Sequence, residues 1–262
     1  APCDLLGGGH RAGSERRAEL KVAGAGHPGG GKRVRVEPLV VALVGLTFAT
    51  GLVDAVSYLG LGHVFAANMT GNIVLLGFAF AGAGGFTAGP SLVALGCFMA
   101  GAAAGGRIAR ALESRRERWL GIALGTECGF TVLAAVSSVG VHAGSGSGRR
   151  FMVIGLLAVG MGVRNATVRR LGVAELTTTV LTMTITGLAA DSELGAHQRQ
   201  RVARRTAAIL AMLGGAFAGG LMIRAGLLLP LVMTVVLLVV LGTGYRMASM
   251  AAPEDRDSSA TA

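Results

Sequence analysis

Two carboxylates stand alone in long apolar stretches of the chain. Asp54 is the only formal charge between Pro38 and Gly106, and Glu127 is the only one between Trp119 and Gly148. An ionisable group within a membrane is costly and usually serves function, such as proton or ion coupling. Each also has a structural alternative: Asp54 would end a helix at the outer interface, and Glu127 would pair with an arginine or a backbone group.

Uncharged polar side chains gather in two further segments. Segment 64–82 contains Asn68, Thr70 and Asn72 around Gly71, and segment 174–190 contains a threonine cluster that includes Thr178, Thr179 and Thr182. Amide and hydroxyl groups on a flexible backbone suit the coordination of an ion or a small polar solute. The alternatives are hydrogen bonds between helices, worth about 0.6 kcal/mol each, and bonds from threonine hydroxyls to their own helix.

The sequence lacks the motifs of familiar catalytic chemistry. It contains no Gly-x-Ser-x-Gly, HExxH, Walker or CxxC pattern, so we expect no enzyme, no cofactor and no metal site. The net charge of +10 comes from arginines in short blocks between apolar segments. That distribution predicts anchors on the cytoplasmic side of a membrane and no nucleic-acid partner.

The elements that must position these side chains follow from hydropathy. About eight apolar segments are present, at 38–58, 64–82, 90–111, 119–141, 151–168, 174–190, 204–224 and 227–247. Eight simple crossings would leave one of the two large arginine blocks, 107–118 or 199–205, outside the cell. If 64–82 and 174–190 dip into the membrane without crossing, both blocks and both termini lie inside, as the positive-inside rule requires.

The predicted fold is therefore an all-α integral membrane protein with about six transmembrane helices and two broken or re-entrant segments. The membrane domain covers 38–247, flanked by tails at 1–37 and 248–262 whose composition predicts disorder. Seven or eight crossings stay open, because threonine-rich apolar sequence can also form an ordinary helix.

The two halves of the membrane domain, 38–143 and 150–247, carry related sequence. Residues 51–77 have an echo in 162–187, which sets Asp54 against Asn165. The small-residue segment with Gly101 and Gly105 is echoed by the one with Gly215 and Gly219, a spacing that lets helix backbones approach closely. Three crossings per half make the repeats inverted, so Asn68, Thr70 and Asn72 are expected near the threonine cluster at a pseudo-two-fold axis.

Two motifs also resemble a known family. TGLVDAVSYLGLGHVFAANMTGNIVLLG and GMGVRNATVRRLGVAELTTTVLTMTITGLAADS are similar to the YoaK-like family of bacterial multi-pass inner-membrane proteins, a domain of unknown function, number 1275. The resemblance covers 38–247 and implies about six spans, but no substrate, cofactor or catalytic residue. The pair Arg164–Asn165 departs from the Gln-Asn type expected there.

The function predicted from these features is a secondary transporter or channel for a small polar solute or ion. The alternative is a membrane scaffold or partner subunit with no transport path of its own. We expect a bacterial plasma-membrane protein with both termini in the cytoplasm, with the lipid bilayer and a small solute as partners and a homo-oligomer left open. The expected path consists of Asp54, Asn68, Thr70, Asn72, Glu127, Asn165, Thr178, Thr179 and Thr182.

Overall fold

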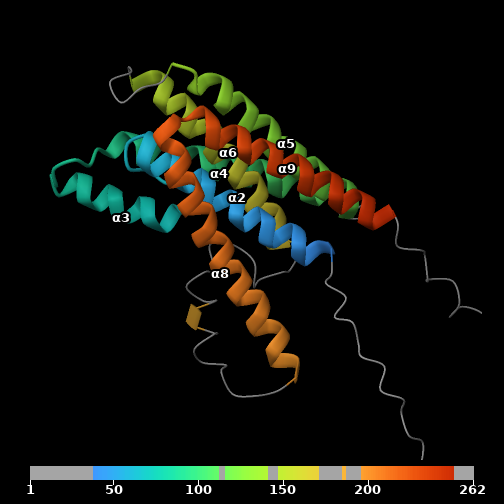
Figure 1. Ribbon diagram of the computed structural model, residues 1–262. Coiled ribbons are helices and arrows are strands. Elements are labelled where there is room, and N and C mark those ends of the chain that lie inside the picture. The colour runs from blue at the N-terminus through green and yellow to red at the C-terminus, as the bar shows by residue number, and fades with distance from the viewer. Residues whose placement is uncertain (1–37, 112–115, 141–146, 171–184, 187–195, 251–262) are drawn as a thin grey trace, which may run out of the picture. The chain divides into compact units, whose positions relative to one another are not determined.

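The computed structural model describes residues 38–111, 116–140, 147–170, 185–186 and 196–250. All regular structure in these ranges is helical (Figure 1), which confirms the all-α prediction. The elements are α2 (Pro38–Gly60), α3 (Met69–Phe80), α4 (Ala88–Ala111), α5 (Arg116–Ser138), α6 (Ser147–Arg170), α8 (Ala196–Met222), the 3₁₀ turn η3 (Ile223–Ala225) and α9 (Leu228–Met250).

Six of the described helices are long and apolar enough to cross a membrane. The candidate spans are Val40–Gly60, Ala88–Ala111, Gly121–Ser138, Gly148–Arg170, Val202–Ala225 and Leu228–Ala248. Helix α3 has only 12 residues, and at 1.5 Å per residue it reaches about 18 Å, too short for a hydrocarbon core of about 30 Å. The prediction of about six spans is therefore confirmed. Segment 174–190 lies outside the described residues, apart from 185–186.

Prolines and glycines punctuate these helices where their backbone chemistry permits. Pro38, Pro90 and Pro230 lie in the first turns of α2, α4 and α9, where a missing N–H breaks no helical hydrogen bond. Gly226, with φ of 113°, separates η3 from α9. Such a φ favours glycine, so the chain can reverse here between two spans.

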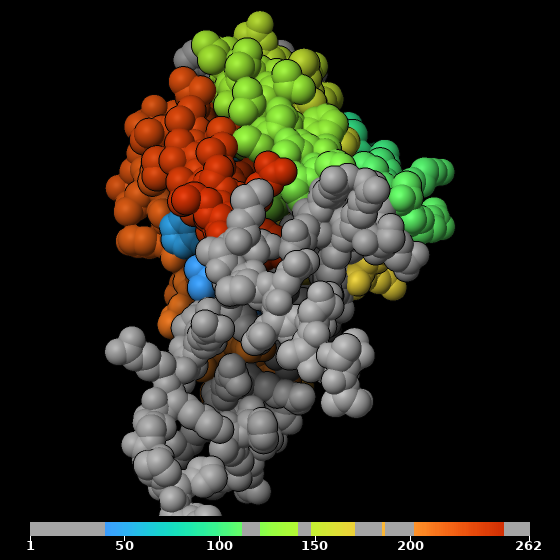
Figure 2. All heavy atoms as spheres, turned by 90° about the vertical axis from the view of Figure 1, so that its right-hand side faces the viewer, coloured from blue at the N-terminus to red at the C-terminus, as the bar shows by residue number. Residues whose placement is uncertain are grey.

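Helices α2 and α6 form the centre of the bundle. In each of them, 67% of the residues in the most apolar stretch are buried, whereas in the other four spans at most 39% are buried. The outer helices expose large apolar side chains, among them Met99, Phe217 and Val240, as expected of surfaces that face lipid. Figure 2 shows α5 and α9 side by side on one face, with little of α2 in sight.

The two ends of the bundle differ in charge. One apolar cluster takes residues from all six spans near one end: Leu43, Leu46, Ala109, Leu124, Val168, Ala208 and Leu238. The helix ends at this level and beyond it carry Arg107, Arg110, Arg169, Arg170, Arg204, Arg205 and Arg246, and we call this the basic end. The opposite end carries Arg149, Arg150 and Arg224. The segment between α2 and α4, which contains α3, begins and ends at this opposite end of the bundle. It therefore enters and leaves on one side and does not cross.

Candidate functional site

A buried ion pair joins α5 to α6. The Oε1 atom of Glu127 lies 2.9 Å from Nη1 of Arg164. Both side chains are shielded from solvent, with relative exposures of 0% for Glu127 and 4% for Arg164. An arginine is the partner that the sequence allowed for Glu127. A pair this deeply buried keeps its charges only because each offsets the cost of desolvating the other.

The guanidinium group of Arg164 also reaches α2. Its Nη1 donates to the carbonyl oxygen of Leu46 at 3.2 Å, and its Nη2 donates to the hydroxyl of Thr50. Thr50 in turn donates to the same carbonyl of Leu46 at 2.9 Å. The sulfur of Met161 accepts a further contact at 3.0 Å. One side chain of α6 therefore bonds to both α2 and α5.

The second oxygen of Glu127 has no such contact. Oε2 is buried and accepts no hydrogen bond from the described residues. A buried acceptor without a partner usually costs about 1–3 kcal/mol, and more for a charged group. Such an atom in a native structure requires an explanation, such as local strain, a catalytic role, or a bound water or ion.

The other intramembrane carboxylate, Asp54, lies on α2 one turn after Thr50. Its Oδ1 accepts the backbone N–H of Ala67 at 2.9 Å. One turn later, the hydroxyl of Ser57 accepts the N–H of Ala66 at 3.1 Å and donates to the carbonyl oxygen of Asp54 at 3.2 Å. These bonds fix the connector between α2 and α3, residues 61–68. Asp54 thus has a structural partner, and its part in coupling stays a prediction.

The polar residues of segment 64–82 face in different directions. Asn72 is fully buried; its Oδ1 accepts the N–H of Phe65 at 2.9 Å and its Nδ2 donates to the carbonyl of Phe65 at 2.6 Å. Asn68 caps the first turn of α3, accepting the N–H of Gly71 at 3.2 Å. Asn68 and Thr70 are exposed. Only Asn72 of the three therefore points into the bundle.

The corresponding residues of the second half are described only in part. Asn165 is half-buried and donates from Nδ2 to the carbonyl oxygen of Met161 in its own helix at 2.9 Å. Its neighbour Arg164, which departs from the resembled motif, provides the counter-charge of Glu127. Thr178, Thr179 and Thr182 lie outside the described residues.

The four packing glycines lie where helices cross. A methyl group on Gly101 of α4 would overlap the carbonyl oxygen of Val159 on α6, and one on Gly105 would lie 2.9 Å from that of Val163. On α8, a methyl group on Gly215 would overlap the carbonyl of Phe48 of α2, and one on Gly219 would lie 3.1 Å from that of Leu52. Helix α4 thus packs backbone to backbone on α6, and α8 packs in the same manner on α2.

A cleft between α5 and α9 opens near the basic end. It encloses about 220 Å³, and its lining includes Leu124 and Cys128 of α5 with Leu238 and Tyr245 of α9. On α5, Leu124 lies one turn before Glu127, and Cys128 directly follows it. The cleft therefore approaches the ion pair along α5, although Glu127 itself faces α6.

The site contains residues that the expected path omitted. Thr50 bonds to Arg164 of the ion pair, and Ser57 bonds to the backbone of Asp54. Both share a helical face with Asp54, because Thr50 lies four residues before it and Ser57 lies three residues after it. That spacing was a usable signal. No comparable signal connects Leu46 to Arg164, since their bond joins positions 118 residues apart.

Comparison with known proteins assigns the chain to a family. The family model described as "Protein of unknown function (DUF1275)" matches residues 42–243, most of the chain. The chain belongs to the DUF1275 family. The UPF0700 transmembrane protein YoaK of Bacillus subtilis (strain 168) is 36% identical over 156 residues, which are 56% of this chain and 64% of that relative. No solved structure matches the chain.

The DUF1275 match includes every element of the candidate site. Asp54, Glu127 and Arg164 lie within residues 42–243, as do the glycines at both helix crossings. The resemblance seen in the sequence is thereby confirmed. The chain is a multi-pass transmembrane protein of this family.

Proposed function

We propose that this protein is a secondary transporter or channel for a small polar solute or ion, with the Glu127–Arg164 pair on its path. The observation that carries this proposal is the buried Oε2 of Glu127, which has no partner among the described residues. An oxygen left open beside an arginine can accept a proton or a polar group of the solute when the ion pair loosens.

The energetics favour function over simple attachment. Placing a charged side chain at mid-membrane costs about 2.5–3.5 kcal/mol on insertion scales. Replacing a buried pair by well-packed apolar residues is often neutral or stabilising. Holding α5 against α6 therefore does not require Glu127 and Arg164, so a charged pair at this depth favours a role in coupling.

Recesses at both ends of the bundle support a path through it. The α5–α9 cleft opens near the basic end, and a second pocket of about 340 Å³ lies at the opposite end, between the ends of α2, α4 and α6. The ion pair lies level with the inner end of the α5–α9 cleft, because Leu124 and Cys128, which line the cleft, flank Glu127 along α5. Alternating access requires a central site that each side can reach in turn.

The two helix crossings support an architecture of inverted repeats. Gly51 of α2 packs on the carbonyl of Met212, while Gly162 of α6 packs on the carbonyl of Phe98. Each contact has its counterpart at the position that the sequence echo predicts. In this proposal α2, the first helix of one half, packs on α8 of the other half, and α6 packs on α4 in the same way. Transport would rock the pair of α2 and α8 against the pair of α6 and α4.

A specific observation also favours the scaffold alternative. Asp54, Ser57 and Asn72 are all bonded to the backbone of the connector 61–68. Intramembrane polar groups can therefore serve the fold alone. In a scaffold, the Glu127 pair would be sealed from water in every state.

Water access at Thr50 distinguishes these functions. In a background without native cysteines, Thr50→Cys places a thiol beside Arg164 with little change in volume, and Ala134→Cys, in the fully buried core of α5, is the matched control. We expect a charged thiol reagent to modify Thr50→Cys at least about tenfold faster. Equal protection of both thiols from either side of sealed vesicles would reject the transport path and favour the scaffold.

A further inference from the structure

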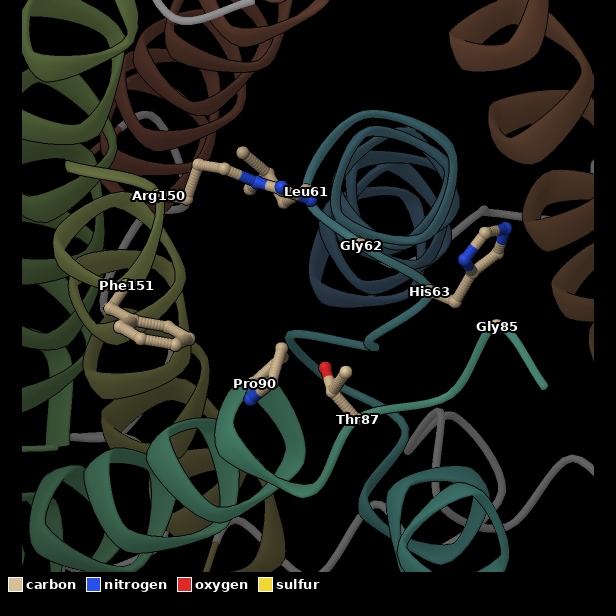
Figure 3. A pocket seen from close by; sticks show the side chains of 8 residues that line it. All are labelled: Leu61, Gly62, His63, Gly85, Thr87, Pro90, Arg150 and Phe151. Atoms are coloured by element: carbon tan, nitrogen blue, oxygen red, sulfur yellow. The ribbon is translucent and has the colours of Figure 1, made fainter. Parts of the chain in front are cut away.

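The pocket at the opposite end of the bundle has a cationic wall. Figure 3 shows Phe151 of α6 opposite Pro90, in the first turn of α4, and Thr87, directly before α4, while Arg150 of α6 extends toward the backbone of Leu61 and Gly62 on the third side. The cavity of about 340 Å³ falls at the small end of ligand pockets, which span about 300–1,000 Å³. From this pocket we infer a binding site for a small oxyanion, a carboxylate or a phosphate group, held by Arg150.

Arg150 lacks a negative partner within the described part of the chain. Its Nε is buried and makes no hydrogen bond there. Asp54 bonds to Ala67 and Glu127 pairs with Arg164, so neither carboxylate serves it, and no acidic side chain lines the pocket. A guanidinium group in this state has its donors available for a bidentate oxyanion.

The connector leaves space for this arginine. Gly62 has φ of 98°, and a methyl group added to it would lie 2.6 Å from Nη2 of Arg150. Any larger residue would therefore meet both backbone strain and the guanidinium group. In Figure 3 the side chain of Arg150 extends toward Leu61 and Gly62, while the ring of His63 turns away from it.

Other groups around the pocket agree with a negatively charged ligand. Helices α4 and α6, of 24 residues each, both begin beside it, because Thr87 precedes α4 and Arg150 lies in the first turn of α6. Helix N-termini carry partial positive charge and attract anions. The hydroxyl of Thr87 points into the cavity, and Phe151 and Pro90 supply apolar walls for a short carbon skeleton.

Arg149 provides an internal control on the same turn. It is exposed and donates from Nη1 to the carbonyl of Val139 at 3.3 Å, toward the end of α5, and it does not line the pocket. Replacing either arginine removes one positive charge from the same end of the bundle. A difference between the two variants therefore reports the pocket and not the general electrostatic potential.

Binding of free anions to the full chain is the first test. The protein, purified in an uncharged detergent at constant ionic strength, is titrated with acetate, succinate and inorganic phosphate while heat of binding and melting temperature are recorded. Arg150→Gln should weaken binding of at least one probe about tenfold or more, since the charge-assisted hydrogen bonds from the guanidinium group to the anion are lost. Arg149→Gln should bind as the parent does, and Arg150→Lys should recover part of the affinity.

A lipid headgroup phosphate offers the same chemistry, so a second arm identifies the source. Lipids retained by parent and variants are quantified by mass spectrometry after reconstitution with phosphatidylglycerol or phosphatidylcholine. Retention that depends on Arg150, without binding of free anions, would assign the site to a headgroup. Equal behaviour of Arg150→Gln and Arg149→Gln in both arms would overturn the site. Because both arms read binding alone, the result is independent of whether the protein transports.

Discussion

Arg164 lies 2.9 Å from Glu127 and donates at the same time to the backbone of Leu46, so a single guanidinium group bonds α6 to α5 and α2. Helices α2 and α6 are the most buried spans of the bundle. The ion pair is consequently a contact at the centre of the protein, and any motion that separates α5 from α6 must break it.

Removing the positive member of the pair should be severely destabilising. Arg164→Gln leaves Glu127 buried without a counter-charge, and breaking a buried pair in this way costs about 3–5 kcal/mol. The thermal or denaturant midpoint of the purified protein in detergent measures this loss. Arg169→Gln, at an exposed position of the same helix, should be nearly neutral. Similar stability of both variants would mean that the pair contributes nothing to the fold.

A double-mutant cycle on the pair completes this stability test. Glu127→Gln keeps the shape of the side chain, and Arg164 retains its bonds to Leu46 and Thr50, so this variant should be tolerated better than Arg164→Gln. The double variant Glu127→Gln/Arg164→Gln should recover part of the loss, because no unpaired charge then stays buried. Strict additivity of the two single changes would contradict the coupling.

Proton coupling, if the protein transports, should depend on Glu127. Proteoliposomes with a trapped pH indicator and an imposed membrane potential report proton flux. Glu127→Gln should abolish that flux with folding intact, because the amide cannot exchange a proton. Asp54→Asn is the paired test of the other intramembrane carboxylate. Full flux in both variants would show that neither acid carries the coupling.

The basic end should face the cytoplasm, with both termini on that side. The described arginines concentrate there, and positive residues flanking spans are retained in the cytoplasm. Reporter fusions after Arg116 and after Arg205 should both read as cytoplasmic, and a fusion after Ala83, between α3 and α4, should read as external. The reverse pattern would refute this orientation.

Two nearby glycines of α4 should differ sharply on substitution. Gly101→Ala places a methyl group against the carbonyl of Val159, whereas Gly106→Ala meets nothing within 4 Å. Forced overlap in a packed contact costs about 1–3 kcal/mol, while alanine at an open helical site gains up to about 1 kcal/mol. Melting temperatures of the two variants should therefore move in opposite directions. Two equal shifts would argue against the close α4–α6 crossing.

The predicted meeting of the two broken segments calls for a direct test. Cysteines at Asn68 and Thr179 in a background without native cysteines should cross-link through a short bifunctional thiol reagent, since repeat-equivalent segments gather at the pseudo-two-fold axis. The control pair combines Thr179→Cys with Val41→Cys. Val41 is exposed near the start of α2. Equal cross-linking of both pairs would remove the support for a shared axis.

The number of spans was predictable because its causes act locally along the chain. The bilayer sets the length of an apolar run, and the positive-inside rule acts on the residues that flank it. The polar composition of segment 64–82 argued against a crossing, and the 12-residue helix α3 agrees. Glu127 was likewise identifiable, because a lone carboxylate in an apolar run is conspicuous without any knowledge of its partner.

The partners of these residues were decided by tertiary structure. Arg164 is 37 residues from Glu127 and 118 from Leu46, and such contacts arise from helix crossings that no local pattern specifies. Asn68 and Asn72 look alike in the sequence, yet the start of α3 turns one outward as a cap and the other inward to Phe65. That Arg150 lines a pocket between the ends of α2, α4 and α6 was likewise decided by the fold, because charge patterns record which side of a membrane a residue faces and not which cavity it enters.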